Sequence, residues 1–285
     1  MIESNLFIDK SLKVSKEEIL NDYYLINESR NLSLIGRKEV FMGRAKFGVF
    51  GDGKELPQIA MSKFFRNGDF RSGYYRDQTF MMAIDQLNAN QFFAQLYAHT
   101  DVNFDPHSGG RQMNCHFGTR MLNSSGNWKT LTDMKNSASD VSCVSGQMPR
   151  IVGLGYASKL YRENKDLGQM HNFSINGNEV IFGTIGDAST SEGHFWESIN
   201  ACGVLQIPVV MSIWDDGYGI SVPSEYHTTR NDLSKVLSGF QRSSKNENGF
   251  ELITVKAWDY EGLLKAYSKA VKVAREDHVP SIIHV

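Results

Sequence analysis

The sequence predicts an α/β protein with a parallel sheet flanked by helices and a helical extension at its N-terminus. Two observations predict this fold class. Near-continuous apolar runs such as IPVVMSIW, residues 207–214, have the composition of strands that are buried on both faces of a parallel sheet. Helical patterns separate these runs along the chain, and this alternation is typical of βαβ units.

The first expected element is a long helix over residues 15–45. Ser15 and Glu18 have the spacing of a capping box, in which each side chain accepts a hydrogen bond from the other residue's backbone N–H. Apolar side chains follow at helical spacing. A second helix is expected over residues 55–66, after the turn-forming sequence GDGK.

A polar stretch without periodicity, residues 101–146, separates these helices from the rest. Irregular segments of this length are usually functional or disordered. Residues 149–164 then read as a helix with proline in its first turn. Its small residues Gly153, Ala157 and Ser158 are expected to form a face suited to close packing.

The remaining elements alternate between strand and helix. The expected strands are EVIFGTIGD, IPVVMSIWDD, FELITVKAW and PSIIHV, and the expected helices are SEGHFWESINACGVLQ and YEGLLKAYSKAVKVARED. In the first of these helices, Phe195, Ile199 and Cys202 share one face, and Trp196 is assigned to the core as well. The basic stretch KAVKVARED is expected to be a solvated helix face.

The 285 residues provide enough chain for a substantial core. We predict an N-terminal helical extension over residues 1–50 and an α/β domain over residues 51–285. The chain stops within the last predicted strand, at Val285. Because domains seldom end on a buried strand, we expect the α/β domain to be truncated at its C-terminal end and the chain to be a piece of a longer polypeptide.

Composition argues against several function classes. A formal net charge of −2 gives no general affinity for nucleic acid or membrane surfaces. The three cysteines, Cys115, Cys143 and Cys202, lack the CxxC spacing of a thiolate zinc site and are too few for a disulfide framework. The chain shows neither a signal-peptide pattern nor an 18-residue apolar run. We therefore expect a cytoplasmic protein without nucleic-acid or membrane partners.

Acidic residues follow two consecutive predicted strands. Asp187 ends one strand, and Asp216 follows the next strand 29 residues later, which is about the length of one βαβ unit. Parallel strands bring their carboxyl ends to the same edge of the sheet, where open α/β sheets bind ligands. Ser189 and Glu192 have capping-box spacing, so the N-terminus of the intervening helix is expected to face the same crevice.

Two carboxylates beside a helix N-terminus suggest Mg²⁺ that bridges the protein to a diphosphate, because Mg²⁺ is commonly held by one or two carboxylates plus phosphate oxygens. The backbone carbonyl of Tyr218 is a third candidate ligand. Asp215 is expected either to belong to the turn or to support the metal ligands without binding the metal itself. The alternative is that Asp187 and Asp216 are ordinary residues at the start of loops. A second GDG sequence, Gly51–Gly53, follows no apolar strand and is predicted to be a turn.

The segment GDASTSEGHFWESINACGVLQIPVVMSIWDDGYGIS resembles the thiamine diphosphate signature, which runs from Gly-Asp-Gly to a paired Asn. Three more segments, GYYRD, GRQMNCHFG and SCVSGQMPRIVGLGYASK, resemble the alpha part of the E1 component of 2-oxo acid dehydrogenases, and GRQMNCHFG is similar to the branched-chain type in particular. The resemblance covers most of the chain from about residue 30. It implies the diphosphate-binding half of the thiamine diphosphate-binding fold.

Carried over residue by residue, this resemblance implies that Asp187, Asp216 and the Tyr218 carbonyl bind Mg²⁺. Tyr75 and Arg76 would contact the diphosphate, and Arg76 also fits this role as a bidentate phosphate partner. The backbone at Val144 would contact the aminopyrimidine ring. The other residues implied at the cofactor are Ser142, Gly186, Ala188, Ser189 and Ile220.

Two weaker implications concern other positions. Ser142 and Gln147 stand where some relatives hold a structural monovalent cation, K⁺. His116, in the matched GRQMNCHFG segment, is the candidate catalytic residue near the cofactor. The alternative for His116 is a hydrogen-bonded structural histidine.

Four features depart from the family pattern. Ala188 replaces the third glycine of the signature, and Trp214 stands where some relatives carry arginine. Asp215–Asp216 replaces the Asn pair and adds negative charge beside an anionic cofactor. This should make cofactor binding more dependent on Mg²⁺ and on Arg76. Relatives also continue past the last strand into a loop with an active-site histidine.

The resemblance implies oxidative decarboxylation of a 2-oxo acid of branched-chain type, with acyl transfer to the lipoyl group of an E2 acyltransferase. The activating glutamate would come from a beta-type, pyrimidine-binding domain or subunit, so we expect a dimer or an α2β2-like assembly and no activity from this chain alone. Alternatives are a pyruvate or acetoin dehydrogenase E1, a transketolase-like enzyme, and a non-catalytic cation-binding α/β module.

Overall fold

The structure is a computed structural model that describes residues 6–9, 12–244 and 247–285. The chain forms two compact units. The first comprises Met1–Phe64, Tyr75–His116 and Lys256–Ser268, and the second comprises Phe65–Tyr74, Phe117–Val255 and Lys269–Val285. The division predicted at residue 50 falls inside the first unit. The assignment of residues 1–50 to a separate extension stays a prediction.

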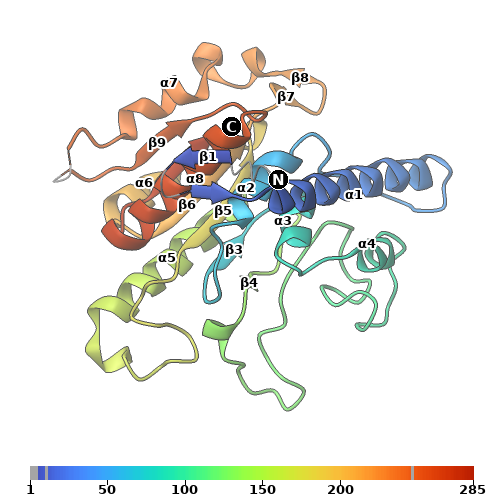
Figure 1. Cartoon of the computed structure of the whole chain (residues 1–285), viewed down its shortest axis with the longest axis horizontal. Helices are drawn as coiled ribbons and strands as arrows, with labels where there is room; N and C mark the ends of the chain where they lie inside the picture. The colour runs from blue at the N-terminus through green and yellow to red at the C-terminus, as the bar shows by residue number, and fades with distance from the viewer. Residues whose placement is uncertain (1–5, 10–11, 245–246) are drawn as a thin grey trace, which may run out of the picture. The chain divides into compact units, whose positions relative to one another are not determined.

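The second unit contains a six-stranded sheet in which every neighbouring pair of strands is parallel (Figure 1). The strands lie in the order β4 (Asn136–Ser137), β3 (Phe70–Ser72), β5 (Ile181–Gly186), β6 (Val209–Trp214), β10 (Ser281–His284) and β9 (Glu251–Thr254). The predicted parallel sheet is confirmed, and so is the adjacency of β5 and β6, the two strands that precede the acidic residues.

Burial on both faces explains the apolar sequences of β5 and β6. All residues of β6 are buried, and so are all residues of β5 except Gly186. The helix α5 (Met148–Glu163) packs close to the sheet at Gly155, where an added Cβ would lie 2.9 Å from Ile207 Cδ1. The predicted packing face was wrong at Gly153, which is exposed. The close contact between the helix and the sheet is made instead at Gly155, two residues further along the helix.

The helix α6 (Gly193–Leu205) begins later than the sequence predicts. Ala188–Ser191 form a 3-10 turn instead, and α6 starts after Glu192 without a side-chain cap. The predicted capping box of Ser189 and Glu192 is therefore wrong. Thr190 donates hydrogen bonds from its backbone N–H and its hydroxyl to the Asp187 carbonyl, and these bonds stabilise the tighter turn. The expected apolar face of α6, with Phe195, is buried.

The first unit is mainly helical. The long helix α1 (Lys16–Phe41) begins with the predicted capping box, because Glu18 N–H donates to Ser15 Oγ and Ser15 N–H donates to the Glu18 carboxylate. α2 (Glu55–Ser62) is shorter than predicted. Two short helices, α3 (Gln78–Ala83) and α4 (Ala89–Leu96), and a hairpin of β1 (Leu6–Asp9) and β2 (Leu12–Val14) also belong to this unit. Across the residues that the structure describes, no helix has both the length and the apolar character needed to span a membrane.

Further elements are the hairpin of β7 (Tyr218–Gly219) and β8 (Val222–Pro223), α7 (Leu233–Leu237) and α8 (Tyr260–Lys272). α8 continues into a π-helical turn, Val273–Asp277. In this turn Arg275 donates two hydrogen bonds to the fully buried Asp69 carboxylate, at 2.7 and 3.0 Å. The predicted solvated face is therefore wrong at Arg275, because a buried carboxylate requires a charged or hydrogen-bonding partner.

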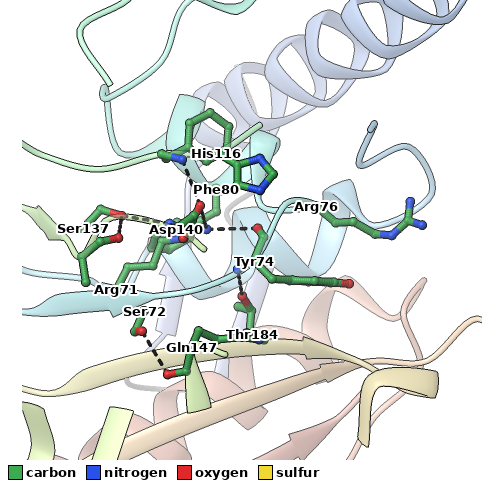
Figure 2. Close-up of polar contacts among 12 residues, drawn as sticks. Arg71, Ser72, Tyr74, Arg76, Phe80, His116, Ser137, Asp140, Gln147 and Thr184 are labelled. Carbon is green, nitrogen blue, oxygen red and sulfur yellow. Dashed lines mark hydrogen bonds and ion pairs between the residues drawn. The ribbon is translucent and has the colours of Figure 1, made fainter. Parts of the chain in front are cut away.

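A buried ion pair anchors the irregular segment that follows β4 (Figure 2). The Arg71 and Asp140 side chains are 0% and 1% exposed. Both terminal nitrogens of Arg71 donate to the Asp140 carboxylate at 3.0 Å, and one of them also donates to Ser137 Oγ at 2.8 Å. Asp140 further accepts a hydrogen bond from Phe117 N–H. The pair fixes the chain between β4 and α5, which carries Ser142 and Val144.

We expect Asp140→Ala to destabilise the protein by about 3–5 kcal/mol, because it leaves the Arg71 charge buried without its partner. Glu163→Ala removes the exposed partner of Lys159 on α5 and should cost less than about 1 kcal/mol. Urea unfolding followed by circular dichroism compares the two variants. Similar losses in both would show that the buried pair has no special role in stability.

Candidate functional site

The carboxyl ends of β5 and β6 place three acidic residues at one edge of the sheet. Gly186 lies opposite Trp214 in the parallel register, and Asp187 N–H donates to the Trp214 carbonyl at 3.2 Å. Asp187 and Asp215 therefore leave the sheet from paired positions, and Asp216 follows one residue later. This is the edge at which the sequence predicts a ligand site.

Asp187 is the most buried of the three acids. Its side chain is buried, with the residue 5% exposed, and its Oδ2 atom has no hydrogen-bond partner. Burial and the negative charge of Asp215 raise the pKa of Asp187 to about 7, and Asp216 contributes to the same shift. A divalent cation would favour the ionised form by offsetting these charges. The residue therefore fits a cation ligand.

Asp215 has partners for both of its carboxylate oxygens. Oδ1 accepts a hydrogen bond from Gly217 N–H at 2.8 Å, which confirms the predicted turn role. Oδ2 lies 2.7 Å from Nε2 of His284 on β10. The hydrogen bond with His284 is the main cause that lowers the pKa of Asp215. His284 could not be identified from the sequence, because no local motif connects it with Asp215.

Asp216 begins the turn that carries the other predicted metal ligand. Its Oδ1 atom accepts a hydrogen bond from Tyr218 N–H at 3.1 Å. The next residue, Gly219, lies against the turn that follows Asp187, since an added Cβ would be 2.7 Å from Ala188 Cβ. Ile220 is fully exposed and has a φ of 59°. Close contact between the two turns thus holds the hairpin at the acidic edge.

A second histidine lies beside Asp187. His227 Nε2 is 3.8 Å from Asp187 Oδ2, and both atoms are buried without a hydrogen-bond partner. Buried polar atoms normally have partners, so this pair marks a place for an ion or a water. His227 lies in irregular chain and had no sequence signal. In the described part of the chain, no three or more His, Cys, Asp or Glu side chains form a metal-binding group. A cation here would therefore also need backbone or ligand oxygens.

The segment before α5 is tied to the same edge. Ser145 Oγ donates to the Ser189 carbonyl at 2.7 Å, which joins this segment to the turn after Asp187. Gln147 Nε2 donates to the carbonyl of Thr184 on β5 at 2.9 Å, and the Gln147 carbonyl accepts from Ser72 (Figure 2). Two predicted cofactor residues in this segment are exposed, Ser142 and Val144.

Three predicted site residues belong to the first unit, where they form their own cluster. The Arg76 guanidinium lies 5.6 Å from the centre of the Tyr75 ring and donates to the Phe50 carbonyl at 2.8 Å. The rings of Tyr75 and His116 are stacked at 6.4 Å. His116 is buried, with Nδ1 3.1 Å from the Asn114 carbonyl. These contacts fit a structural histidine, and its catalytic assignment stays a prediction.

Comparison with known proteins gives a family match over most of the chain. The model of the family described as "Dehydrogenase E1 component" matches residues 29–285. The alpha subunit of 2-oxoisovalerate dehydrogenase from Bacillus subtilis is 27% identical over 243 residues, which cover 85% of this chain and 62% of that subunit. The mitochondrial alpha subunit from Homo sapiens is 23% identical over 256 residues, or 90% of this chain and 49% of that protein.

The chain thus spans about half to three-fifths of the length of these relatives. Among solved structures, a transketolase from Campylobacter jejuni superposes with a TM-score of 0.54 at 14% sequence identity. The superposition covers 92% of this chain and 37% of the transketolase chain. At this identity the likeness establishes the fold alone.

We expect Asp187→Asn to stabilise the cation-free protein at pH 8 by on the order of 1 kcal/mol. Because folding raises the pKa of Asp187 to about 7, the stability that its protonation provides is lost as the pH rises towards and through 7. This loss begins near the ordinary pKa of 3.8, so the gain from asparagine should be present at pH 5 but smaller than at pH 8. Thermal unfolding in EDTA at both pH values measures this difference, with the exposed Asp166→Asn as the control. Equal effects at both pH values would contradict the assignment.

Proposed function

Because the chain belongs to the dehydrogenase E1 component family, we propose that it is the alpha-type, diphosphate-binding part of a thiamine diphosphate-dependent 2-oxo acid dehydrogenase. The observation that carries the proposal is the partnerless Asp187 oxygen at the edge that Asp216 shares. The 2-oxoisovalerate dehydrogenase alpha subunits among the relatives favour a branched-chain substrate.

The proposed cation is Mg²⁺, held by Asp187, Asp216 and the Tyr218 carbonyl. Oxygen ligands and a small number of carboxylates suit Mg²⁺ when phosphate oxygens complete its coordination. Arg76 has the planar donor set for the diphosphate, and its guanidinium already lies beside the Tyr75 ring. When bound, thiamine diphosphate supplies the electron sink for loss of CO₂ from a 2-oxo acid.

The other residues around the two turns would shape the cofactor site. Ala188 is small, and a side chain at Gly219 would clash with it, since an added Cβ there would lie 2.7 Å from Ala188 Cβ. Val144 is exposed in a segment that Ser145 ties to the same edge, which suits a backbone contact with the aminopyrimidine ring. A monovalent cation at Ser142 and Gln147 stays a prediction. The Gln147 side-chain N–H group is already engaged by a carbonyl, so the cation would use its amide oxygen.

We propose two protein partners and an assembly that joins the alpha and beta parts. A beta-type, pyrimidine-binding domain or subunit would supply the glutamate that activates the cofactor. A lipoyl acyltransferase E2 would accept the acyl group, and a dimer or an α2β2-like assembly would join the alpha and beta parts. The family match and the alpha-subunit relatives support these partners.

Calorimetry of the protein assembled with its beta-type partner tests this function. Thiamine diphosphate and Mg²⁺ should each strengthen the binding of the other, and the assembled enzyme should release CO₂ from 2-oxoisovalerate faster than from pyruvate. Cation binding that is indifferent to the cofactor would instead indicate a non-catalytic cation-binding module. Faster turnover of pyruvate would contradict the branched-chain assignment but would agree with a thiamine diphosphate-dependent 2-oxo acid dehydrogenase.

Asp216 offers the sharpest single test of the proposed cation ligands. We expect Asp216→Ala to weaken Mg²⁺-dependent cofactor binding by at least about 100-fold, or about 2.8 kcal/mol. Asp216→Asn should retain binding, because its amide oxygen remains a ligand. The exposed Asp166→Ala serves as the control, and circular dichroism checks the fold. If alanine has no effect, or asparagine abolishes binding as alanine does, Asp216 is not a ligand.

A further inference from the structure

A chain of hydrogen bonds connects Asp215 to three residues on other elements of the second unit. His284 on β10 lies with Nε2 2.7 Å from Asp215 Oδ2. Its other ring nitrogen, Nδ1, is 2.6 Å from the hydroxyl of Ser234 on α7. That hydroxyl is in turn 2.8 Å from the hydroxyl of Thr254, the last residue of β9. Residues of β9, α7 and β10 are thus linked in series to one carboxylate oxygen of Asp215, and His284 on β10 makes the direct contact.

One assignment of protons satisfies every member of this chain. The Asp215 carboxylate accepts, so His284 Nε2 carries a proton and donates to it. Nδ1 then accepts from the Ser234 hydroxyl, and Ser234 accepts from the Thr254 hydroxyl. The histidine ring is held on both sides, and its orientation follows from these contacts.

As a consequence, Asp215 and Asp187, which follow paired positions of neighbouring strands, have different surroundings. Gly217 N–H and His284 occupy one oxygen each of Asp215, whose side chain is 26% exposed. Asp187 Oδ2, across the strand pair, is buried and without a hydrogen-bond partner. Without His284, Asp215 Oδ2 would lose this contact and stand at the same edge as Asp187 and Asp216.

We propose that His284 is a positioning residue that keeps Asp215 out of the coordination of the bound cation and so leaves Asp187 and Asp216 as its carboxylate ligands. This inference rests on the proposed function. Its physical basis is ligand number: Mg²⁺ requires six ligands in a tight octahedron, whereas Ca²⁺ accepts six to eight oxygens in a flexible arrangement. A third free carboxylate would therefore favour Ca²⁺ relative to Mg²⁺.

The test compares Mg²⁺ and Ca²⁺ binding by calorimetry in the presence of thiamine diphosphate, using the protein assembled with its beta-type partner. We expect His284→Ala to lower Mg²⁺ affinity by about 10- to 100-fold and to reduce the preference for Mg²⁺ over Ca²⁺. His284→Gln, whose amide N–H can still donate to Asp215, should keep most of the Mg²⁺ affinity and most of the preference for Mg²⁺. The double variant Asp215→Asn/His284→Ala has no third carboxylate and should regain the preference for Mg²⁺.

The outcomes separate this inference from the function on which it rests. If the unaltered protein does not bind Mg²⁺ and thiamine diphosphate jointly, the proposed function fails. If it does and His284→Ala leaves the cation preference unchanged, His284 has no positioning role. An equal loss for both cations that Asp215→Asn does not restore would show a merely structural role and would also overturn the proposal.

A milder variant guards against loss of folding in His284→Ala. Ser234→Ala retains both Asp215 and His284 but removes the hydroxyl that orients the ring. It should shift the cation preference in the same direction by a smaller factor, with the unfolding temperature close to that of the unaltered protein. An unchanged preference in Ser234→Ala, together with a His284→Ala variant that does not fold, counts against the proposal.

Discussion

The pairing of β5 with β6 is the constraint on which the site depends. Because Gly186 pairs with Trp214 in this register, Asp187 and Asp215 lie side by side after the ends of the two strands, and Asp216 lies one residue further along the chain. Carboxylates in such proximity repel one another, and burial of Asp187 adds to the cost of its charge, as its raised pKa shows. A fold that keeps this arrangement must offset the charge with a cation or with hydrogen-bond donors. The surroundings of the three acids show both solutions: donors for Asp215 and a partnerless oxygen on Asp187.

Elements away from the acids hold this edge in place. Gly155 lets α5 approach the sheet closely, and the segment before α5 reaches the turn after Asp187 through Ser145. The buried pair of Arg71 and Asp140 fixes the start of that segment. A buried ion pair contributes less to stability than its Coulomb energy suggests, because both charges lose their hydration. Its value here is geometric, since it orders chain that has almost no regular secondary structure.

The parallel sheet and the acidic edge could be predicted because both depend on patterns within single segments, such as the unbroken apolar runs of β5 and β6. Contacts between distant residues could not be predicted. His284 lies 69 residues from Asp215, and Arg275 lies 206 residues from Asp69, so neither pairing leaves a local signature. The wrong start of α6 has a different cause: the spacing of a capping box was present, but the hydrogen bonds from Thr190 to the Asp187 carbonyl stabilise a competing turn.

The same long-range contact changes how the Asp215–Asp216 pair should be understood. The sequence suggests that both carboxylates add negative charge beside an anionic diphosphate, which would increase the dependence of binding on Mg²⁺ and on Arg76. In the structure, the charge of Asp215 is directed towards His284 and Gly217 N–H, so its repulsion of a ligand at the edge is reduced. A cation at the edge must then offset the charges of Asp187 and Asp216 and the part of the Asp215 charge that still raises the pKa of Asp187.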